Sequence, residues 1–285
     1  MLIPIHKKGN HNNPDNYRGI VLVNIISKIY ISILNKRLTF YTDIFDSISE
    51  SQAGFRKGYC TTDNAFILYS VVNKYLRKKG GKLYVAFVDF RKAFDYVNRS
   101  KMYNILQKNG ISGHLLNSIT ALYKSVQMCI RSPNTGSLTD FFDSKLGLRQ
   151  GCNLSPLLFS IFINELTVDI QDSGAQGVQL TPSLIHVLSL LFADDVALLA
   201  DTIVGLQKQL NTLQRFCTKN TMYVNTEKTK VLVFKRGGRL SRREKWYYND
   251  IRLECVSGFT YVGMYFSNTL SLYKMAEQSA VCHES

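Results

Sequence analysis

The apolar positions of the chain follow two spacings, one typical of strands and one typical of helices. Residues Leu2–His6 form a short strand-like segment, and residues 26–38 carry apolar side chains at helical spacing. A second helix is predicted from the capping residues Thr61–Asp63 to the basic residues before Gly80. Residues 83–88 are continuously apolar, which indicates a strand that is covered on both faces.

Beyond residue 90 the predicted elements interleave without a regular repeat. In chain order they are helices at residues 99–109 and 113–125, a helix opened by Ser155–Pro156, strands within residues 190–200, a helix around residues 206–217 and a strand at residues 231–234. Irregular interleaving favours an antiparallel sheet with helices on one face over a doubly wound sheet. The sequence therefore predicts an α+β fold.

Composition narrows the class of protein. Of the 285 residues, 45% are hydrophobic, which is enough to bury a core and excludes a mainly disordered chain. No apolar run approaches ~18 residues, so neither a membrane-spanning helix nor a membrane partner is expected. The six cysteines are scattered singly, without the pairs of a zinc site or the density of a disulfide scaffold.

The net charge of +14 is distributed unevenly. Residues 1–85 carry a net charge of +8 and residues 201–285 a net charge of +6, whereas residues 86–200 are neutral. Two basic flanks around an acid-containing centre are typical of a protein that binds a polyanion such as nucleic acid. A positive charge that serves only solubility is the alternative.

Three aspartates occur where apolar strands end or turn. Asp89 ends the apolar run at residues 83–88, and Asp194 and Asp195 form a turn inside the apolar segment 190–199. A carboxylate at the rim of a dry sheet is costly unless a cation neutralises it. If the two strands lie side by side, the acids form an oxygen site suited to Mg²⁺ and to two-metal phosphoryl chemistry. Ordinary turn and strand-end chemistry is the alternative for each feature alone.

Several motifs together resemble one known family. The segments 87–95, 147–159 and 192–195 resemble the first three palm motifs of reverse transcriptases, of the kind found in LINE-like (non-LTR) retrotransposons. The further segments with family resemblance are residues 4–9, 16–20 and 52–58 for the fingers, 225–230 for the fourth palm motif and 261–263 for the primer grip. These motifs occur in the family's order and span nearly the whole chain.

The resemblance implies a right-hand polymerase fold, in which an antiparallel palm sheet packs on helices. The implied parts are fingers at residues 1–82, a palm with inserted fingers and helical segments at 83–235, and a primer-grip region with the start of a thumb at 236–285. The fingers are expected to be N-terminally incomplete and the thumb truncated, so the sequence is expected to be a fragment or the remnant of a decayed element.

The resemblance also assigns the acids to metal binding. It implies that Asp89 and Asp194 are the principal ligands of two Mg²⁺ ions, with Mn²⁺ as an alternative metal. Asp195 would support the catalytic geometry as a third acid, and the backbone carbonyl of Phe90 is a further candidate ligand. Lys228 resembles the general acid that protonates the departing pyrophosphate, although Lys230 competes for this role.

Other residues of the motifs are implied to hold the nucleotide and the nucleic acids. Either Lys7 or Lys8 would clamp the triphosphate together with Arg18. Phe94 would exclude a 2′-hydroxyl and so select deoxynucleotides. The remaining implied contacts are the nucleotide contacts of Gln150 and Gly151, and the template or primer contacts of Arg56, Lys57, Tyr261, Val262 and Gly263. The basic stretch 235–245 is interpreted either as a contact to a duplex backbone or as a solvated loop.

The function implied by these motifs is that of a nucleotidyltransferase, an RNA-directed DNA polymerase. It would use an RNA template, a DNA primer and deoxynucleoside triphosphates, and it is expected inside the cell, in the nucleus or the cytoplasm. An inert retrotransposon remnant that only binds nucleic acid is the main alternative. An unrelated two-metal phosphohydrolase explains neither Phe94 nor the paired fingers and palm motifs.

Overall fold

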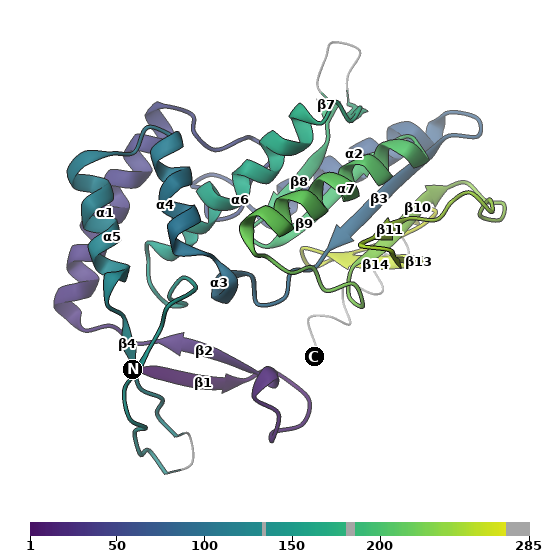
Figure 1. The fold of residues 1–285 in the computed structure, drawn as a ribbon. Coiled ribbons are helices and arrows are strands. Elements are labelled where there is room, and N and C mark those ends of the chain that lie inside the picture. The colour runs from purple at the N-terminus through teal and green to yellow at the C-terminus, as the bar shows by residue number, and fades with distance from the viewer. Residues whose placement is uncertain (133–134, 181–185, 272–285) are drawn as a thin grey trace. The chain divides into compact units, whose positions relative to one another are not determined.

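The computed structural model of the chain describes residues 1–132, 135–180 and 186–271 (Figure 1). It divides into two compact units, each made from two separate stretches of sequence. Unit 1 contains residues 1–48 and 92–162, and unit 2 contains residues 49–91 and 163–285. The assignment of residue ranges to fingers, palm and thumb stays a sequence-based prediction, and the expected start of the thumb after residue 271 lies outside the described residues.

Unit 1 combines a β-hairpin with helices of 4 to 20 residues. Its strands and helices are β1 (Leu2–His6), the 3₁₀ turn η1 (Pro14–Asn16), β2 (Tyr17–Val21), α1 (Ile25–Ile44), α3 (Ala93–Tyr96), α4 (Arg99–Lys108), α5 (Gly113–Lys124), β4 (Gln127–Met128) and β5 (Phe142–Asp143). Asn24 and Asn98 begin α1 and α4, because their side chains accept hydrogen bonds from the free N–H groups of the first turns. Helix α6 (Ser155–Asp172) starts in unit 1 and ends in unit 2.

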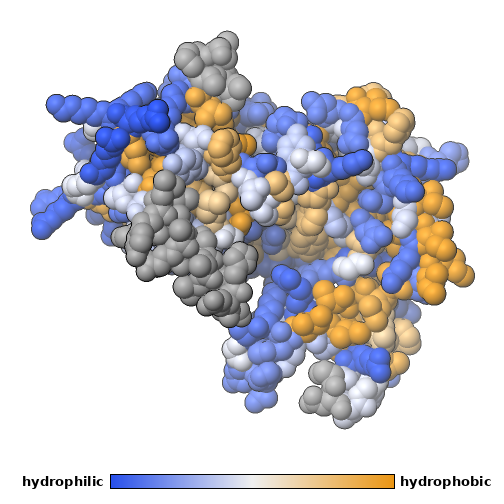
Figure 2. All heavy atoms as spheres, turned by 180° about the vertical axis from the view of Figure 1, so that it is seen from behind, coloured by the Kyte–Doolittle hydropathy of each residue, from blue (hydrophilic) through white to orange (hydrophobic). Residues whose placement is uncertain are grey.

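Helix α1 is longer than the sequence predicts, and most of its predicted apolar stripe is not its buried face. The buried side chains are Ile31, Leu34, Leu38 and Thr42. Exposed isoleucines cover another side of the helix, including Ile26, which is 81% exposed. Apolar side chains gather on this side of unit 1 in Figure 2. Helical spacing therefore identified the element but not the face that packs, because both faces of the helix carry apolar residues.

A five-stranded sheet forms the centre of unit 2, in the order β13-β10-β3-β9-β8. The strands are β3 (Lys82–Val88), β8 (Ser189–Phe192), β9 (Asp195–Ala200), β10 (Lys230–Lys235) and β13 (Glu254–Val256). All pairs are antiparallel except β10 with β13, so the sheet is mixed rather than purely antiparallel as the sequence predicts. The chain leaves β10, passes through the hairpin of β11 (Tyr247–Tyr248) and β12 (Ile251–Arg252), and returns in the same direction.

Helices cover both faces of this sheet, which corrects the expectation of helices on one face. Helix α2 (Thr61–Arg77) lies behind the sheet in Figure 1 and α7 (Ile203–Asn220) lies in front of it. Successive side chains of β3 point to opposite faces of the sheet, and nearly all of them are buried. The continuous apolarity of residues 83–88 predicted such a doubly covered strand, and this part of the prediction is confirmed.

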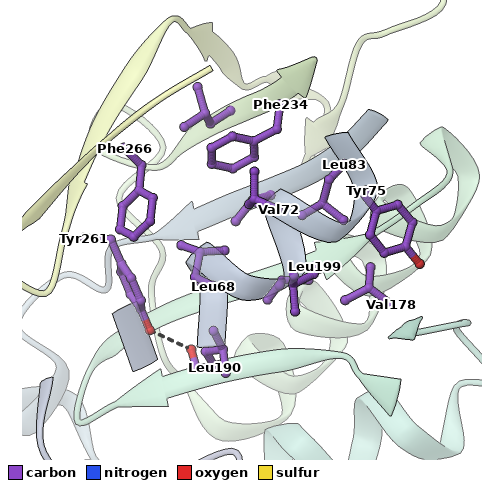
Figure 3. Close-up of a cluster of buried hydrophobic side chains, with 14 of the residues drawn as sticks. Leu68, Val72, Tyr75, Leu83, Val178, Leu190, Leu199, Phe234, Tyr261 and Phe266 are labelled. Atoms are coloured by element: carbon purple, nitrogen blue, oxygen red, sulfur yellow. Dashed lines mark hydrogen bonds between the residues drawn. The ribbon is translucent and has the colours of Figure 1, made fainter. Parts of the chain in front are cut away.

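One hydrophobic cluster joins α2, the sheet and a C-terminal hairpin (Figure 3). The hairpin consists of β14 (Gly258–Tyr261) and β15 (Met264–Ser267), and its Phe259 ring stacks on Phe87 with centroids 4.4 Å apart. The Tyr261 hydroxyl donates a hydrogen bond to the Leu190 carbonyl at 3.2 Å. The cluster therefore ties the hairpin to β3 and β8, the strands that lead to the candidate acids.

Two short elements complete the described part of the chain. Strands β6 (Val178–Gln179) and β7 (His186–Val187) pair at the edge of unit 2. None of the helices in residues 1–132, 135–180 and 186–271 has the length and apolarity needed to cross a membrane.

Candidate active site

The strand register of unit 2 brings two of the predicted acids together. Strand β3 pairs antiparallel with β9, with Val88 opposite Val196. One residue further along this register, Asp89 stands beside Asp195. Residues opposite each other in such a pair have Cα atoms about 4.5–5.5 Å apart and side chains on the same face. Two carboxylates that are 106 positions apart in the sequence are therefore neighbours in the fold.

The third acid lies in the two-residue turn that joins β8 to β9. Phe192 pairs with Asp195, which leaves Ala193 and Asp194 as the central turn residues. Ala193 has a φ of 58°, as the first central residue of a type II′ turn requires. A two-residue loop keeps Asp194 next to Asp195, so all three acids lie at one end of the sheet.

A buried glutamine that the sequence analysis did not single out holds this turn. The Gln52 side chain is fully buried, and its Oε1 accepts hydrogen bonds from the N–H groups of Ala193 (3.2 Å) and Gly54 (2.8 Å). Its Nε2 donates to the Ala193 carbonyl at 3.5 Å. A Cβ atom at Gly54 would lie 2.1 Å from the Ala193 nitrogen. The resemblance of residues 52–58 to a fingers motif pointed to this segment but not to its contact with the acid-bearing turn.

Arg56 lies in the same motif, where a template or nucleotide contact was predicted. Its guanidinium donates to the carbonyls of Ser49 (3.2 Å) and Gln52 (3.4 Å) and pairs with Glu50 at 3.2 Å. The Arg56 side chain therefore braces the loop that carries Gln52. Lys57 is exposed, and its template contact stays a prediction.

The backbone of Asp89 is fixed by the segment that resembles the fourth palm motif. The Asn225 N–H donates to the Asp89 carbonyl at 2.7 Å, and the Asp89 N–H donates to Thr229 Oγ1 at 3.1 Å. These two bonds fix the backbone of Asp89 at the end of β3. Thr229 is fully buried, and the sequence analysis did not identify its role.

The carbonyl of Phe90, a predicted metal ligand, points toward the acids' side of β3. Residues 223–225 bond the Asp89 carbonyl and the Arg91 N–H, so they run along the edge of β3 that β10 also uses. Successive carbonyls of a strand point to opposite edges. The Phe90 carbonyl therefore points to the edge on which β9 carries Asp195.

The two lysines that compete for the general-acid role have different surroundings. Lys230 forms an ion pair with Glu254 of the neighbouring strand β13. Lys228 is exposed, and its ammonium takes part in no salt bridge within the part of the chain that the structure describes. The Lys228 N–H donates to the Asn225 carbonyl at 3.2 Å, which fixes its backbone next to the turn that binds Asp89.

The acids concentrate negative charge at this end of the sheet. Removal from water is the largest cause that raises the pKa of Asp195 to about 6, and the Asp194 and Asp89 carboxylates add to it. Asp195 still keeps an exposed surface. A divalent cation is the partner that would remove the mutual repulsion of these carboxylates.

The donor set fits a hard metal ion, although its side chains do not converge. Among the described residues, no three His, Cys, Asp or Glu side chains approach closely enough to hold a metal. The backbone arrangement supplies three carboxylates and the Phe90 carbonyl, which are the oxygen ligands that Mg²⁺ prefers.

In unit 1, two predicted phosphate-binding cations share one face of the β1–β2 hairpin. Arg18 pairs with Ile5 across the hairpin, and the Lys7 N–H donates to the Asn16 carbonyl at 2.8 Å. Lys7 and Ile5 alternate on the same face, so Lys7 and Arg18 point to the same side. Lys8, the other candidate, lies in the bend that follows, and its phosphate contact stays a prediction.

Asp95, six residues after Asp89, is an acid of unit 1 to which the sequence analysis assigns no site role. Its Oδ1 accepts a hydrogen bond from Gln150 Nε2 at 3.0 Å. Burial raises the pKa of Asp95, although this hydrogen bond and the charges of Lys92, Lys7 and Arg18 act to lower it. The predicted nucleotide residues Lys7, Arg18 and Gln150 are therefore gathered around one carboxylate.

Gly151 and Phe94 also occupy defined positions in unit 1. Gly151 has a φ of 96°, and a Cβ atom there would lie 3.0 Å from the Val21 carbonyl. The half-buried Phe94 ring stacks on Phe159 with centroids 4.4 Å apart. The loop before Gln150 is thus confined by packing, and the ring of Phe94 has a fixed orientation.

Arg99 is a further residue that the sequence analysis missed. It is 7% exposed, and its guanidinium donates to the carbonyls of Ser144, Leu146 and Gly147 as well as that of Tyr123. A single buried cation thereby orders the loop that leads to Gln150. The only signal in the sequence is an arginine among helix residues, which is usually a surface position.

A cavity of about 610 Å³ in unit 1 opens beside these residues. Its walls include Tyr17, Lys92, Asp95, Arg149 and Gln150. A volume of this order lies within the range of small-molecule sites, and a mixed apolar and charged lining suits a ligand with a ring and a charged group.

The predicted primer-grip residues lie on the β14–β15 hairpin of unit 2. Tyr261 is 3% exposed and packs in the cluster of Figure 3, so its side chain serves the core. Val262 and Gly263 form the turn, with φ values of 44° and 85°. A positive φ strains a β-branched residue, and such strain is concentrated at functional positions. Any nucleic-acid contact of this hairpin is therefore expected from the turn.

We expect Gln52→Ala to destabilise unit 2. The substitution leaves the buried N–H groups of Ala193 and Gly54 without their acceptor, which costs about 2–4 kcal/mol of unfolding free energy. Urea denaturation measures this loss, and Gln107→Ala on the exposed side of α4 is the matched control, with a change within about 0.5 kcal/mol. Equal, small effects of the two substitutions would contradict the role of Gln52.

Asp195→Asn is expected to stabilise the protein in the presence of a chelator at pH 8. The pKa of Asp195 lies near 6 when folded, against about 3.9 when unfolded, so its ionisation opposes folding above pH 6. Because the group keeps an exposed surface, we expect a gain of only about 1 kcal/mol, or roughly 2–4 °C in Tm.

This gain should shrink as the pH falls below 6 and vanish below about pH 3.9, where the wild-type carboxyl is protonated in both the folded and the unfolded state. Thermal melts at a series of pH values measure it, with Asp140→Asn on an exposed loop as the control. A gain that is constant with pH, or that also occurs in the control, would contradict the raised pKa of Asp195.

Comparisons with known proteins are consistent with this geometry. Residues 5–266 match the family described as "Reverse transcriptase (RNA-dependent DNA polymerase)". The chain is 31% identical over 274 residues to a "Retrovirus-related Pol polyprotein from type-1 retrotransposable element R2" of Popillia japonica, which covers 93% of this chain and 37% of the relative. It is 27% identical to a "Probable RNA-directed DNA polymerase from transposon BS" of Drosophila melanogaster, over 80% of this chain and 25% of the relative.

The fold has solved counterparts at low sequence identity. The structure of apo telomerase from Candida tropicalis, truncated from its C-terminal domain, superimposes with a TM-score of 0.61 at 14% identity, covering 90% of this chain and 52% of that one. The architecture is that of the right-hand polymerases, with a mixed central sheet. The chain spans less than two fifths of the length of the curated relatives named above. The family match and the R2 relative confirm the resemblance drawn from the motifs: the chain belongs to the reverse transcriptase family, with relatives in non-LTR retrotransposons.

Proposed function

We propose that this chain is an RNA-directed DNA polymerase domain, which adds deoxynucleotides to the 3′ end of a primer on an RNA template. The observation that carries the proposal is the β3–β9 register, which sets Asp89 beside Asp195 and next to the turn with Asp194. Membership of the reverse transcriptase family supports the same reaction. The alternative of an inert remnant is not favoured, because all three acids and their supporting contacts are intact.

The acids would hold two Mg²⁺ ions, or Mn²⁺ in their place. Asp89 and Asp194 would be the principal ligands, with Asp195 and the Phe90 carbonyl completing the set. When bound, such ions supply the charge that activates a primer hydroxyl and neutralises the leaving group. The raised pKa of Asp195 supports this assignment, because burial and the Asp194 and Asp89 carboxylates oppose its ionisation, and a bound cation would favour the ionised form.

Lys228 would donate the proton to the departing pyrophosphate. Its exposed ammonium belongs to a segment that also binds the backbone of Asp89, whereas Lys230 is engaged by Glu254. A proton donor must reach the leaving group, and a free lysine meets this need better than one held in an ion pair.

The residues of unit 1 would bind the incoming nucleotide. Lys7 and Arg18 would contact the triphosphate, where Arg suits bidentate bonds and Lys acts as a point charge. Gln150, oriented by Asp95, would donate to the sugar or a phosphate. The half-buried ring of Phe94 would leave no room for a 2′-hydroxyl.

Nucleic-acid contacts would come from two segments of unit 2. The Arg56 side chain braces its own loop. The neighbouring Lys57 is exposed and is therefore the better candidate for a template contact. The turn of Val262 and Gly263 would contact the primer through its backbone.

Primer extension tests the proposed reaction. We expect the chain to extend a DNA primer on an RNA template with Mg²⁺ and deoxynucleotides, and Asp194→Ala to lower the rate by at least about 10³-fold, because it removes a metal ligand. Asp172→Ala, an exposed residue at the end of α6, should leave the rate unchanged. Binding of primer–template without extension by the wild type would instead support a remnant that only binds nucleic acid.

Phe94→Ala tests the selection of the sugar. Removing the ring makes space at the 2′ position, so we expect the preference for deoxynucleotides over ribonucleotides to fall by about 10–100-fold. The ratio of single-nucleotide incorporation rates measures this change. Phe141→Ala, at an exposed phenylalanine of unit 1, serves as the matched control. An unchanged ratio in Phe94→Ala would mean that this ring only packs on Phe159.

A further inference from the structure

The end of the central sheet opposite the acids collects an unusual amount of positive charge. Strand β3 begins at Lys82 and β10 ends at Lys235, and these two residues pair in the register. The loops at residues 77–82 and 235–245 therefore leave the sheet from adjacent strands, and Figure 1 shows both at the end where β3 starts. Together these seventeen residues contain ten Lys or Arg and one Glu, out of a net charge of +14 for the whole chain.

Most of these cations have no partner in the described residues. Arginines 236, 239, 242 and 243 and Lys245 on the second loop are all exposed, as are Arg77 and Lys79 on the first. None of the seven forms a salt bridge within residues 1–132, 135–180 and 186–271. We call these seven residues the basic platform.

The longer loop is anchored rather than free. Glu244 is 2% exposed and accepts hydrogen bonds from Lys82 Nζ (2.6 Å), Tyr84 Oη (3.2 Å) and the Ser241 N–H (2.5 Å). Trp246 is fully buried, and its ring lies 5.2 Å from that of Tyr84. The single acid of the loop is thus used to fix it, while its arginines point to solvent. Such anchoring reduces the entropy lost when the arginines bind a ligand.

The platform is separate from the catalytic acids. The seven residues of β3 separate the platform from the acids, and at about 3.3 Å per residue this distance is roughly 20 Å. This distance exceeds the Debye length of about 10 Å at 0.1 M salt, so the acids do not cancel the positive potential of the platform. A ligand on the platform is therefore distinct from a primer end at Asp89.

The residue types indicate the kind of ligand. Arginines that carry no aromatic partners suit phosphate oxygens, which they bind in bidentate fashion. Stacking of single-stranded bases needs exposed aromatic rings, and neither loop contains an aromatic residue. Trp246, which follows the second loop, is buried, and the 42% exposed Tyr247 after it belongs to β11. The platform therefore fits the phosphate backbone of a double helix.

We propose that the basic platform is a second nucleic-acid-binding surface of this protein, which holds the backbone of a duplex away from the polymerase site. The contact is independent of base sequence and depends on salt. A DNA duplex and a folded RNA present the same backbone chemistry, and the experiment distinguishes them.

Fluorescence anisotropy with the full chain tests this surface. Labelled 24-base-pair DNA and RNA duplexes are titrated between 50 and 250 mM KCl, with EDTA and an excess of an unlabelled short primer–template that occupies the polymerase site. The variant R236A/R239A/R242A/R243A should bind the preferred duplex at least tenfold more weakly at 100 mM KCl. The slope of log K against log salt should fall by about 3–4, at ~0.9 per lost phosphate contact on DNA.

Three comparisons keep the result interpretable. The variant K28A/K36A/R37A/K124A removes the same charge from exposed positions of unit 1 and should change binding less than threefold. R236K/R239K/R242K/R243K keeps the charge and should restore binding to within about threefold, which separates a charge effect from misfolding. R77A/K79A alters the other loop and should weaken binding further when combined with the four alanines.

The surface does not depend on the polymerase reaction, so the two proposals can fail separately. Extension of the short primer–template by R236A/R239A/R242A/R243A should match the wild type. No duplex binding by the wild type under competition, or equal losses in the platform and unit 1 variants, would overturn the platform. A wild type that binds duplex without extending a primer would contradict only the polymerase proposal.

Discussion

Repulsion between carboxylates held side by side is the constraint around which unit 2 is built. Antiparallel pairing of β3 with β9 fixes Asp89 next to Asp195, and a two-residue turn adds Asp194. The backbone register keeps the Cα atoms of these acids close together whatever positions their side chains take. The sheet must therefore be stable enough to carry charges that oppose its own formation.

Neighbouring elements provide that stability through bonds to the backbone of the acid-bearing segments. The Gln52 side chain forms hydrogen bonds with the N–H and the carbonyl of Ala193 in the acid-bearing turn. The N–H of Asn225 and the hydroxyl of Thr229 form hydrogen bonds with the carbonyl and the N–H of Asp89. Each support uses the backbone and leaves the carboxylates themselves accessible. Below them, the cluster of α2 with the sheet and the β14–β15 hairpin fills the core with apolar side chains. The result is a packed frame with three acids at one end and basic loops at the other.

Local sequence patterns predicted much of this frame. The doubly covered strand at residues 83–88 and the helix from Thr61 to Arg77 lie where apolar runs and capping residues indicated. The motif resemblance identified the acids as candidate metal ligands, and the strand register brings Asp89 and Asp195 together. These features depend on short-range patterns or on the order of motifs along the chain, and a single sequence shows both.

Features that long-range contacts determine could not be predicted from the sequence. The parallel pairing of β13 depends on a path through the β11–β12 hairpin, and the buried face of α1 depends on what packs against it. Gln52 and Arg99 are polar residues that pattern analysis assigns to the surface, yet each satisfies backbone groups of a distant loop. Tyr261 belongs to a motif associated with the primer, but its ring lies in the core. In each case tertiary packing overrides the local signal.

A double-mutant cycle between Asp89→Asn and Asp195→Asn tests the central claim most directly. Unfolding free energies of the wild type, both single variants and the double variant are measured in chelator at pH 8. If the two carboxylates are neighbours, each single substitution relieves the same repulsion, and the double variant gains less than the sum by about 1 kcal/mol. Additive effects within about 0.3 kcal/mol would mean that the two acids do not interact, and the shared metal site would then have no basis in the fold.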